Sequence, residues 1–209
     1  MGNNRKLTEN LTQPNIFKRI VWAFLILHLV PTLTAFAIGY FFLPREILRS
    51  APIITPAEFV AQLKEFWPHF LSTLGFNLGI VLLLGVGCNT QRVKGFPMGY
   101  VYILVQSIMV GIIAGTNSFT LQIISPYTLA GWLVALRVGY LEFLGYTCIV
   151  ASTIGVVLEE YDRWKWKPDR KRRWQNIRFS RQEIIGLVIG IILVIIAGYN
   201  ETTLVFPNV

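Results

Sequence analysis

Five long apolar blocks constrain this chain more than any other feature. A helix needs about 20 apolar residues to cross the roughly 30 Å hydrocarbon core of a bilayer. Hydrophobic residues make up 54% of the chain and charged residues only 14%, which is typical of a membrane protein. The blocks are 20–43, 66–87, 96–115, 133–158 and 183–199. Because backbone polar groups need partners in lipid, the blocks predict an all-α, polytopic bundle of five transmembrane helices.

The basic residues predict the orientation of these helices. With five spans, fifteen of the 19 Lys and Arg residues lie on the side of the N-terminus, many of them in the loop 159–182. The exceptions are Arg45, Arg49, Lys64 and Arg137. Loops rich in Lys and Arg stay in the cytoplasm. We therefore expect a cytoplasmic tail 1–19, a single membrane domain 20–200 and an external tail 201–209, in the cytoplasmic (inner) membrane of a prokaryote.

Two loops carry helix signals of their own. In "TPAEFVAQLKEFW", Thr55 and Glu58 have capping-box spacing, and apolar residues follow at helical intervals. This pattern predicts a short amphipathic helix at about 55–66 on the outer surface. In the loop 116–136, an uncharged stretch begins at Ser125. This stretch is either an interfacial or re-entrant segment or the start of a long fourth span.

Three glycine pairs have the G-x-x-x-G spacing, which lets helix backbones approach closely in lipid. They are Gly75–Gly79, Gly111–Gly115 and Gly186–Gly190. Each pair lies in a different span. We therefore expect a tightly packed bundle or a homo-oligomer, and not a catalytic centre.

One carboxylate, Glu142, lies inside the fourth span, where a charge is costly. A helical wheel places Gly139 on the same small, partly polar face, which predicts contact with other helices. In a structural interpretation, Glu142 bonds Asn77 or Gln106 and holds the packing together. In a functional one, it carries a proton or an ion, or lines a solute path. Arg137 points about 140° away on a straight helix, so a pair with Glu142 needs a helix break or a second protomer.

Residue patterns for catalysis and metal binding are absent from the sequence. The chain lacks an H-E-x-x-H motif and a C-x-x-C motif, and its spans lack paired Asp residues. His28 and His69 have no second ligand at metal-binding spacing. We therefore expect a protein that is not an enzyme and that has no cofactor and no metal site.

The loop 159–182 interleaves cations with aromatic residues, as in "RWKWKPDRKRRWQNIRFSR". This pattern is typical of a membrane anchor, with Trp at the headgroups and cations toward anionic lipid. Docking of a cytoplasmic protein is the alternative. We expect no nucleic-acid partner, because the adjacent membrane already explains the charge. The candidate contact residues are Arg163, Lys165, Lys167, Arg170, Lys171, Arg172 and Arg173.

Two sequence stretches support a family resemblance. They are "FLSTLGFNLGIVLLLGVGCNTQRVKGFPMGY" and "RVGYLEFLGYTCIVASTIG", within roughly residues 66–160. Their pattern resembles the stage II sporulation protein M family of integral membrane proteins. The matching residues are Asn77, Gly95, Gly99, Gly139 and Glu142. The chain departs from the family at Lys94, Arg137 and Val138, where the family has Asn, Pro and His.

The resemblance implies a membrane protein of a complex. Family members in spore formers are implied to act in engulfment, together with peptidoglycan-remodelling enzymes. The first hypothesis is therefore a non-enzymatic scaffold, or a component of a membrane-associated complex, in envelope or membrane remodelling. The alternative is a transporter or channel subunit in which Glu142 is the intramembrane coupling or gating carboxylate.

Overall fold

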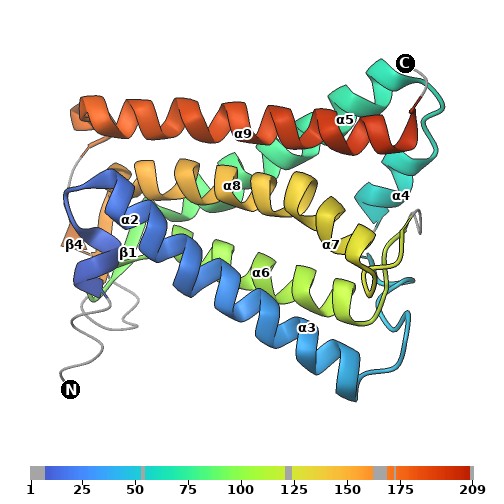
Figure 1. Cartoon of the computed structure of the whole chain (residues 1–209). Helices are drawn as coiled ribbons and strands as arrows, with labels where there is room; N and C mark the ends of the chain where they lie inside the picture. Colours follow the sequence, from blue (N-terminus) through green and yellow to red (C-terminus); the bar gives the residue numbers. More distant parts are fainter. Residues whose placement is uncertain (1–7, 53–54, 121–123, 162–168, 172, 208–209) are drawn as a thin grey trace.

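The chain folds mainly into long apolar helices (Figure 1). The computed structural model describes residues 8–52, 55–120, 124–161, 169–171 and 173–207. Four helices in these ranges are long and apolar enough to cross a membrane. They are Ile16–Phe42, Phe66–Val86, Leu129–Ser152 and Arg181–Val205. A further apolar helix, α6 (Gly99–Gly115), has 17 residues. The prediction of a mostly helical protein with several membrane-spanning helices is therefore confirmed.

Three of the long helices contain a π-helical turn. The first consists of α2 (Ile16–Ala23), η1 (Phe24–Leu29) and α3 (Val30–Phe42). The second consists of α5 (Phe66–Ile80) and η3 (Val81–Val86), and the third of α7 (Leu129–Ala135), η4 (Leu136–Tyr140) and α8 (Leu141–Ser152). The last, α9 (Arg181–Val205), is α-helical throughout. In the first helix the wide turn directly precedes Pro31, which has no N–H to donate to the preceding turn.

Glycines make the closest helix contacts in the bundle. The pair Gly111–Gly115 of α6 lies against α3, where a Cβ at Gly111 would stand 2.7 Å from the Cβ of Ala35. In α9, a Cβ at Gly190 would stand 2.8 Å from the carbonyl oxygen of Gly145 in α8. Two of the three predicted glycine pairs therefore pack inside the chain. The pair Gly75–Gly79 has no neighbour within 4 Å at either position.

The helix of the fourth span differs from its predicted bounds of 133–158. It begins at Leu129, where the side chain of Thr128 accepts a hydrogen bond from the backbone N–H of Gly131. It then continues without a break through η4 into α8, so the loop 116–136 ends in the start of a long helix. The helix stops at Ser152, and the short 3-10 turn η5 (Ile154–Val156) follows.

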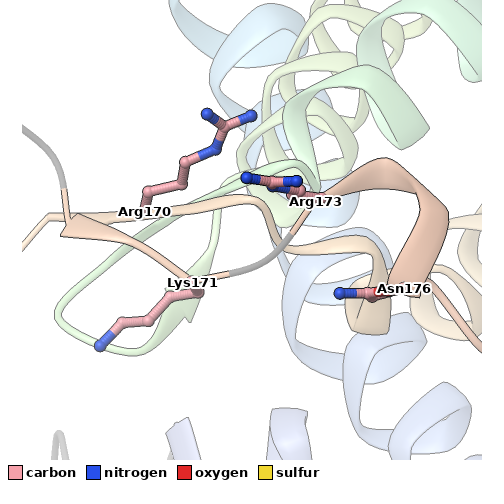
Figure 2. Close-up of a pocket in the computed structure, with 4 residues that line it drawn as sticks. All are labelled: Arg170, Lys171, Arg173 and Asn176. Atoms are coloured by element: carbon pink, nitrogen blue, oxygen red, sulfur yellow. The ribbon is translucent and has the colours of Figure 1, made fainter.

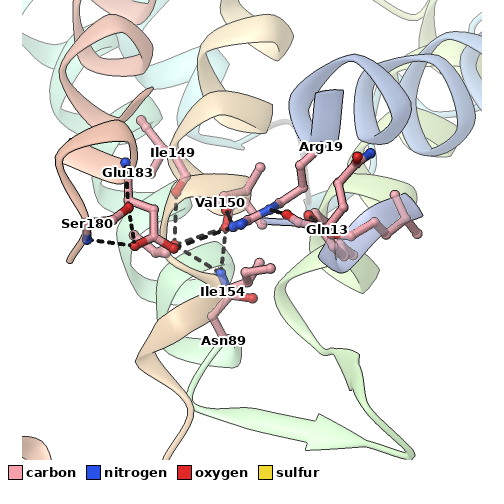
Figure 3. A network of polar contacts seen from close by, with 12 residues as sticks. Gln13, Arg19, Asn89, Ile149, Val150, Ile154, Ser180 and Glu183 are labelled. Carbon is pink, nitrogen blue, oxygen red and sulfur yellow. Dashed lines mark hydrogen bonds and ion pairs between the residues drawn. The ribbon is translucent and has the colours of Figure 1, made fainter. Parts of the chain in front are cut away.

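The early end of α8 is explained by side chains that bind its last carbonyls (Figure 3). The final carbonyls of a helix have no partner within the helix. Arg19 of α2 donates to the carbonyl of Ala151 at 2.8 Å. The buried Asn89 donates to the carbonyl of Val150, also at 2.8 Å. These contacts join residues far apart in sequence, so local patterns do not reveal them.

Arg19 also joins α2 to α9. Its side chain is buried, and its guanidinium lies 3.6 Å from the carboxylate of Glu183. Glu183 in turn forms a capping box with Ser180 at the start of α9. Since a buried ion pair needs further hydrogen bonds to offset desolvation, these added contacts hold the three helix ends together.

A small sheet closes the same end of the bundle, and the sequence did not predict it. Its strands are β1 (Gln91–Val93), β2 (Phe96–Pro97), β3 (Glu159–Tyr161) and β4 (Asp169–Arg170), in the order β2-β1-β3-β4. The central pair is parallel, and the outer pairs are antiparallel. Strands of two or three residues are too short to carry an alternating pattern. The sheet ties the basic loop to the turn before α6.

The predicted helix of the first loop is present but shorter than 55–66. It is α4 (Thr55–Ala61), and it ends before α5 begins at Phe66. Val60 on α4 is buried, while the neighbouring Phe59 is exposed. The helix therefore packs one apolar position into the bundle and leaves another on the surface.

The packing of α6 on α3 predicts a difference between two Gly→Ala variants. In Gly115→Ala, the new Cβ would collide with the backbone of Phe36 and Gly39, so we expect a loss of about 1–3 kcal/mol in the free energy of unfolding. In Gly139→Ala, nothing lies within 4 Å, so stability should stay the same. Thermal unfolding in detergent measures both. Equal effects would contradict this account of the helix contact.

The buried ion pair predicts a large effect at Arg19. In Arg19→Met, Glu183 loses its cation and the carbonyl of Ala151 loses its donor, so we expect a loss of about 3 kcal/mol. The exposed Arg178, replaced by Met in the same way, is the control and should cost little. Chemical denaturation followed by Trp fluorescence compares them. A neutral Arg19→Met would mean that the ion pair does not hold the helix ends.

Candidate functional site

Glu142 lies in the first turn of α8, directly after the π-helical turn η4, and is partly buried. The hydroxyl of Tyr146, one turn later, donates a hydrogen bond to its Oε1. The ring of Tyr102, from α6, lies 6.3 Å from the ring of Tyr146. Glu142 is therefore held at a contact between α8 and α6, with aromatic hydroxyls around it.

A second carboxylate, Glu201, follows Asn200, whose side chain contacts the segment just before Glu142. It comes from α9, which pairs with α8 in the antiparallel sense (Figure 1). The amide of Asn200 donates to the carbonyl of Arg137 at 2.9 Å, which places the next residue, Glu201, beside the junction of η4 and α8. Among the described residues, no Lys or Arg forms an ion pair with either carboxylate.

The hydroxyl of Tyr102 is the third polar group of this site. The side chain is buried, and its hydroxyl has no hydrogen-bond partner in the described part of the chain. Gln106 follows Tyr102 by one turn on the same helix α6. An unpaired buried hydroxyl costs about 1–3 kcal/mol, so a bound species that pairs with it would be favoured.

Of the two residues predicted to bond Glu142, one lies at its depth and the other forms no hydrogen bond with it in the described structure. Gln106 lies at the depth of Glu142, because α6 and α8 run antiparallel and the contact between Tyr102 and Tyr146 sets their register (Figure 1). Asn77 is partly buried on α5, and the described residues include no hydrogen bond from it to Glu142. Tyr146, one turn away on the same helix, forms the hydrogen bond with Glu142 instead.

Arg137 and Gly139, in the segment before Glu142, place no side chain against it. The side chain of Arg137 is exposed, and it forms no ion pair with Glu142 in the described structure. The helix widens at η4 without breaking, so the two side chains stay apart. Gly139 has no neighbour within 4 Å and makes no close helix contact.

A buried histidine packs directly beside the site. His28 of the first helix stacks on Phe143, with ring centroids 4.2 Å apart, and its Nδ1 lies 2.9 Å from the hydroxyl oxygen of Ser107. His28 is therefore packed inside the bundle, between an aromatic ring and a serine hydroxyl. Within the described residues, no three His, Cys, Asp or Glu side chains are grouped so as to hold a metal ion.

The candidate contact residues of the basic loop are only partly described. Arg163, Lys165, Lys167 and Arg172 lie outside the described residues. The other three, Arg170, Lys171 and Arg173, line a hollow together with Asn176 (Figure 2). This hollow is lined from β4 and the short turn after it, at the end of the bundle that holds the small sheet (Figure 1).

Three residues of the carboxylate site were missed by sequence reasoning. Tyr146 lies four residues after Glu142, and this spacing on a helix could have identified it. Glu201 follows the predicted end of the fifth span at 199 and was assigned to the external tail. Tyr102 gave no signal, because a tyrosine near a helix start is typical of a membrane interface.

No known protein family, curated protein or solved structure matches this chain. The case for a function therefore rests on these residues and their geometry.

The hydrogen bond from Tyr146 predicts how stability responds at Glu142. In Glu142→Gln, the side-chain carbonyl still accepts this bond, so the unfolding midpoint should change little. In Glu142→Leu, the Tyr146 hydroxyl loses its acceptor in a low-dielectric setting, which should cost about 1–3 kcal/mol. Thermal unfolding of the two variants in the same detergent provides the comparison. Equal midpoints for Gln and Leu would contradict a role for this bond.

Proposed function

We propose that this chain is a non-enzymatic, five-span membrane protein that acts as a transporter or channel subunit. Glu142 is the coupling or gating carboxylate, and Glu201 is the second carboxylate of the same site. The observation that carries the proposal is this pair of acids on neighbouring membrane helices, with no basic partner among the described residues.

The physical argument concerns the cost of two adjacent acids in a membrane. A single carboxylate in hydrocarbon is costly, and a second nearby adds repulsion when both are charged. A proton or a monovalent cation between Glu142 and Glu201 would relieve both costs. The hydroxyls of Tyr102 and Tyr146 and the amide of Gln106 add neutral oxygen ligands at the same depth.

Five spans and a cytoplasmic N-terminus are part of this proposal. The helix α6 has 17 residues, which at 1.5 Å each is about 25 Å, near the lower limit for a span. If α6 crosses the membrane, the small sheet and the start of α9 lie on the side of the N-terminus. That side carries most of the cations, so the positive-inside rule places it in the cytoplasm, as in a prokaryotic inner membrane.

A scaffold is the second candidate function. The pair Gly75–Gly79 on α5 has no neighbour within 4 Å inside the chain, while the other two glycine pairs are packed. A second copy of the chain, or another membrane protein, would find a surface there that permits close helix approach. The resemblance to the stage II sporulation protein M family, if it holds, would imply the same role.

Flux in liposomes tests the transporter proposal. We expect wild-type protein to support a proton- or cation-dependent flux, and both Glu142→Gln and Glu201→Gln to reduce it at least about tenfold, since each removes an acid that binds the cation. The matched control is Glu65→Gln, which makes the same change at an exposed position just before α5.

Two outcomes would favour the scaffold instead. The first is a flux that is absent in the wild-type protein, or one that is unchanged in both Gln variants although the protein folds. The second is an oligomer in detergent that dissociates in Gly79→Ile. Size-exclusion chromatography with light scattering measures that dissociation.

A further inference from the structure

The hollow beside the small sheet has a lining made of hydrogen-bond donors. It measures about 310 Å³ and is lined by Arg170, Lys171, Arg173 and Asn176. Three of these side chains are cationic, and the fourth offers an amide N–H₂. Among the residues that the structure describes here, no carboxylate contributes to the lining. Such a set of donors suits an oxyanion, because guanidinium groups bind phosphate oxygens with two parallel hydrogen bonds.

The backbone under the hollow is fixed by hydrogen bonds. Arg170 belongs to β4, which pairs with β3, and the N–H of Lys171 donates to the carbonyl of Leu158 at 2.8 Å. On the other wall, the N–H of Asn176 donates to the carbonyl of Arg173 at 3.0 Å, within the turn η6 (Trp174–Asn176). Arg170 therefore starts from a paired strand, and Arg173 starts from the beginning of the turn η6.

The three cationic side chains of the lining differ in whether they already form an ion pair with a carboxylate. The ammonium of Lys171 lies 3.2 Å from the carboxylate of Glu160, which neutralises it. Neither Arg170 nor Arg173 has an ion pair within the part of the chain that the structure describes. Figure 2 shows the two guanidinium groups facing the same space, while Lys171 points to the opposite side of the strand.

Aromatic residues place the hollow at the membrane surface. Trp174 follows Arg173 directly and is 62% exposed, and Phe179 is 40% exposed. The apolar helix α9 begins at Arg181. Trp is enriched where lipid headgroups meet the hydrocarbon, so these rings and the start of α9 bring the hollow to headgroup depth.

We propose that this hollow binds the phosphate group of an anionic lipid headgroup, with Arg170 and Arg173 as its two charged donors and Asn176 as a neutral one. The site is separate from the Glu142 site and does not depend on the proposed transport function. It differs from general attraction between a basic loop and a membrane because two particular cations, and not the total charge, should determine binding.

Lipid binding with charge-matched variants tests this proposal. The double variant R170Q/R173Q removes two cations from the hollow, and R178Q/R181Q removes two exposed cations from the same segment outside it. Binding of phosphatidylglycerol to protein in phosphatidylcholine nanodiscs is measured by native mass spectrometry. We expect at least about tenfold weaker binding for R170Q/R173Q, and a loss of less than about threefold for R178Q/R181Q.

Equal losses in the two double variants would overturn the proposal in favour of diffuse attraction, as would no loss in either. A third variant, Asn176→Asp, keeps both arginines but adds a carboxylate to the lining, and it should also weaken binding. Unfolding midpoints in phosphatidylcholine alone check that each variant folds.

In a separate arm, inorganic phosphate competes with the lipid. Competition supports recognition of the phosphate group from either source, and a lack of competition supports a headgroup that must be presented by the membrane.

Discussion

The end of α8 is the constraint on which the rest of the bundle depends. In lipid every backbone carbonyl needs a partner, and α8 stops inside the protein, where water cannot supply one. Arg19 and Asn89 bind its last carbonyls from two distant segments. Since Arg19 also pairs with Glu183, the same contact fixes where α9 begins. Three helices are thus aligned at one end by one cluster of polar side chains (Figure 3).

This alignment determines which residues of α8 and α9 lie side by side at the opposite end of these two helices. From Ser152, which lies against Gly186, the helices α8 and α9 run antiparallel with small residues at their contact. Gly145 and Gly190 let the two backbones approach, which keeps the register fixed along the pair. Glu142 and Glu201 are therefore brought together by packing that begins many residues away. Neither acid would be informative alone, because a single intramembrane carboxylate has a plausible structural role.

The sequence predicted those parts of the fold that have a long, regular signal. Hydropathy located the spanning helices, and the capping-box spacing of Thr55 and Glu58 located the short helix of the first loop. It could not locate the end of α8, which is set by hydrogen bonds from Arg19 and Asn89. It also could not separate the packed glycine pairs from Gly75–Gly79, since all three have the same spacing.

The candidate site was predictable only in part, for a related reason. Glu142 stood out because a charged residue interrupts an apolar run. Glu201 did not, because it follows Tyr199 and Asn200 at the polar end of the last block, where a carboxylate is ordinary. Its importance comes from the observed length of α9, which extends to Val205 and keeps Glu201 within the helix beside α8.

The central claim is that Glu142 and Glu201 form one site that binds a proton or a cation within the membrane. Labelling with a hydrophobic carbodiimide, which reacts with protonated carboxyl groups in apolar surroundings, tests it directly by peptide mass spectrometry. The account predicts that Glu142 is modified in liposomes, that Glu201→Gln changes the rate of this modification, and that the exposed Glu65 reacts far more slowly. An unmodified Glu142, or a rate that is the same with and without the Glu201 carboxylate, would contradict it.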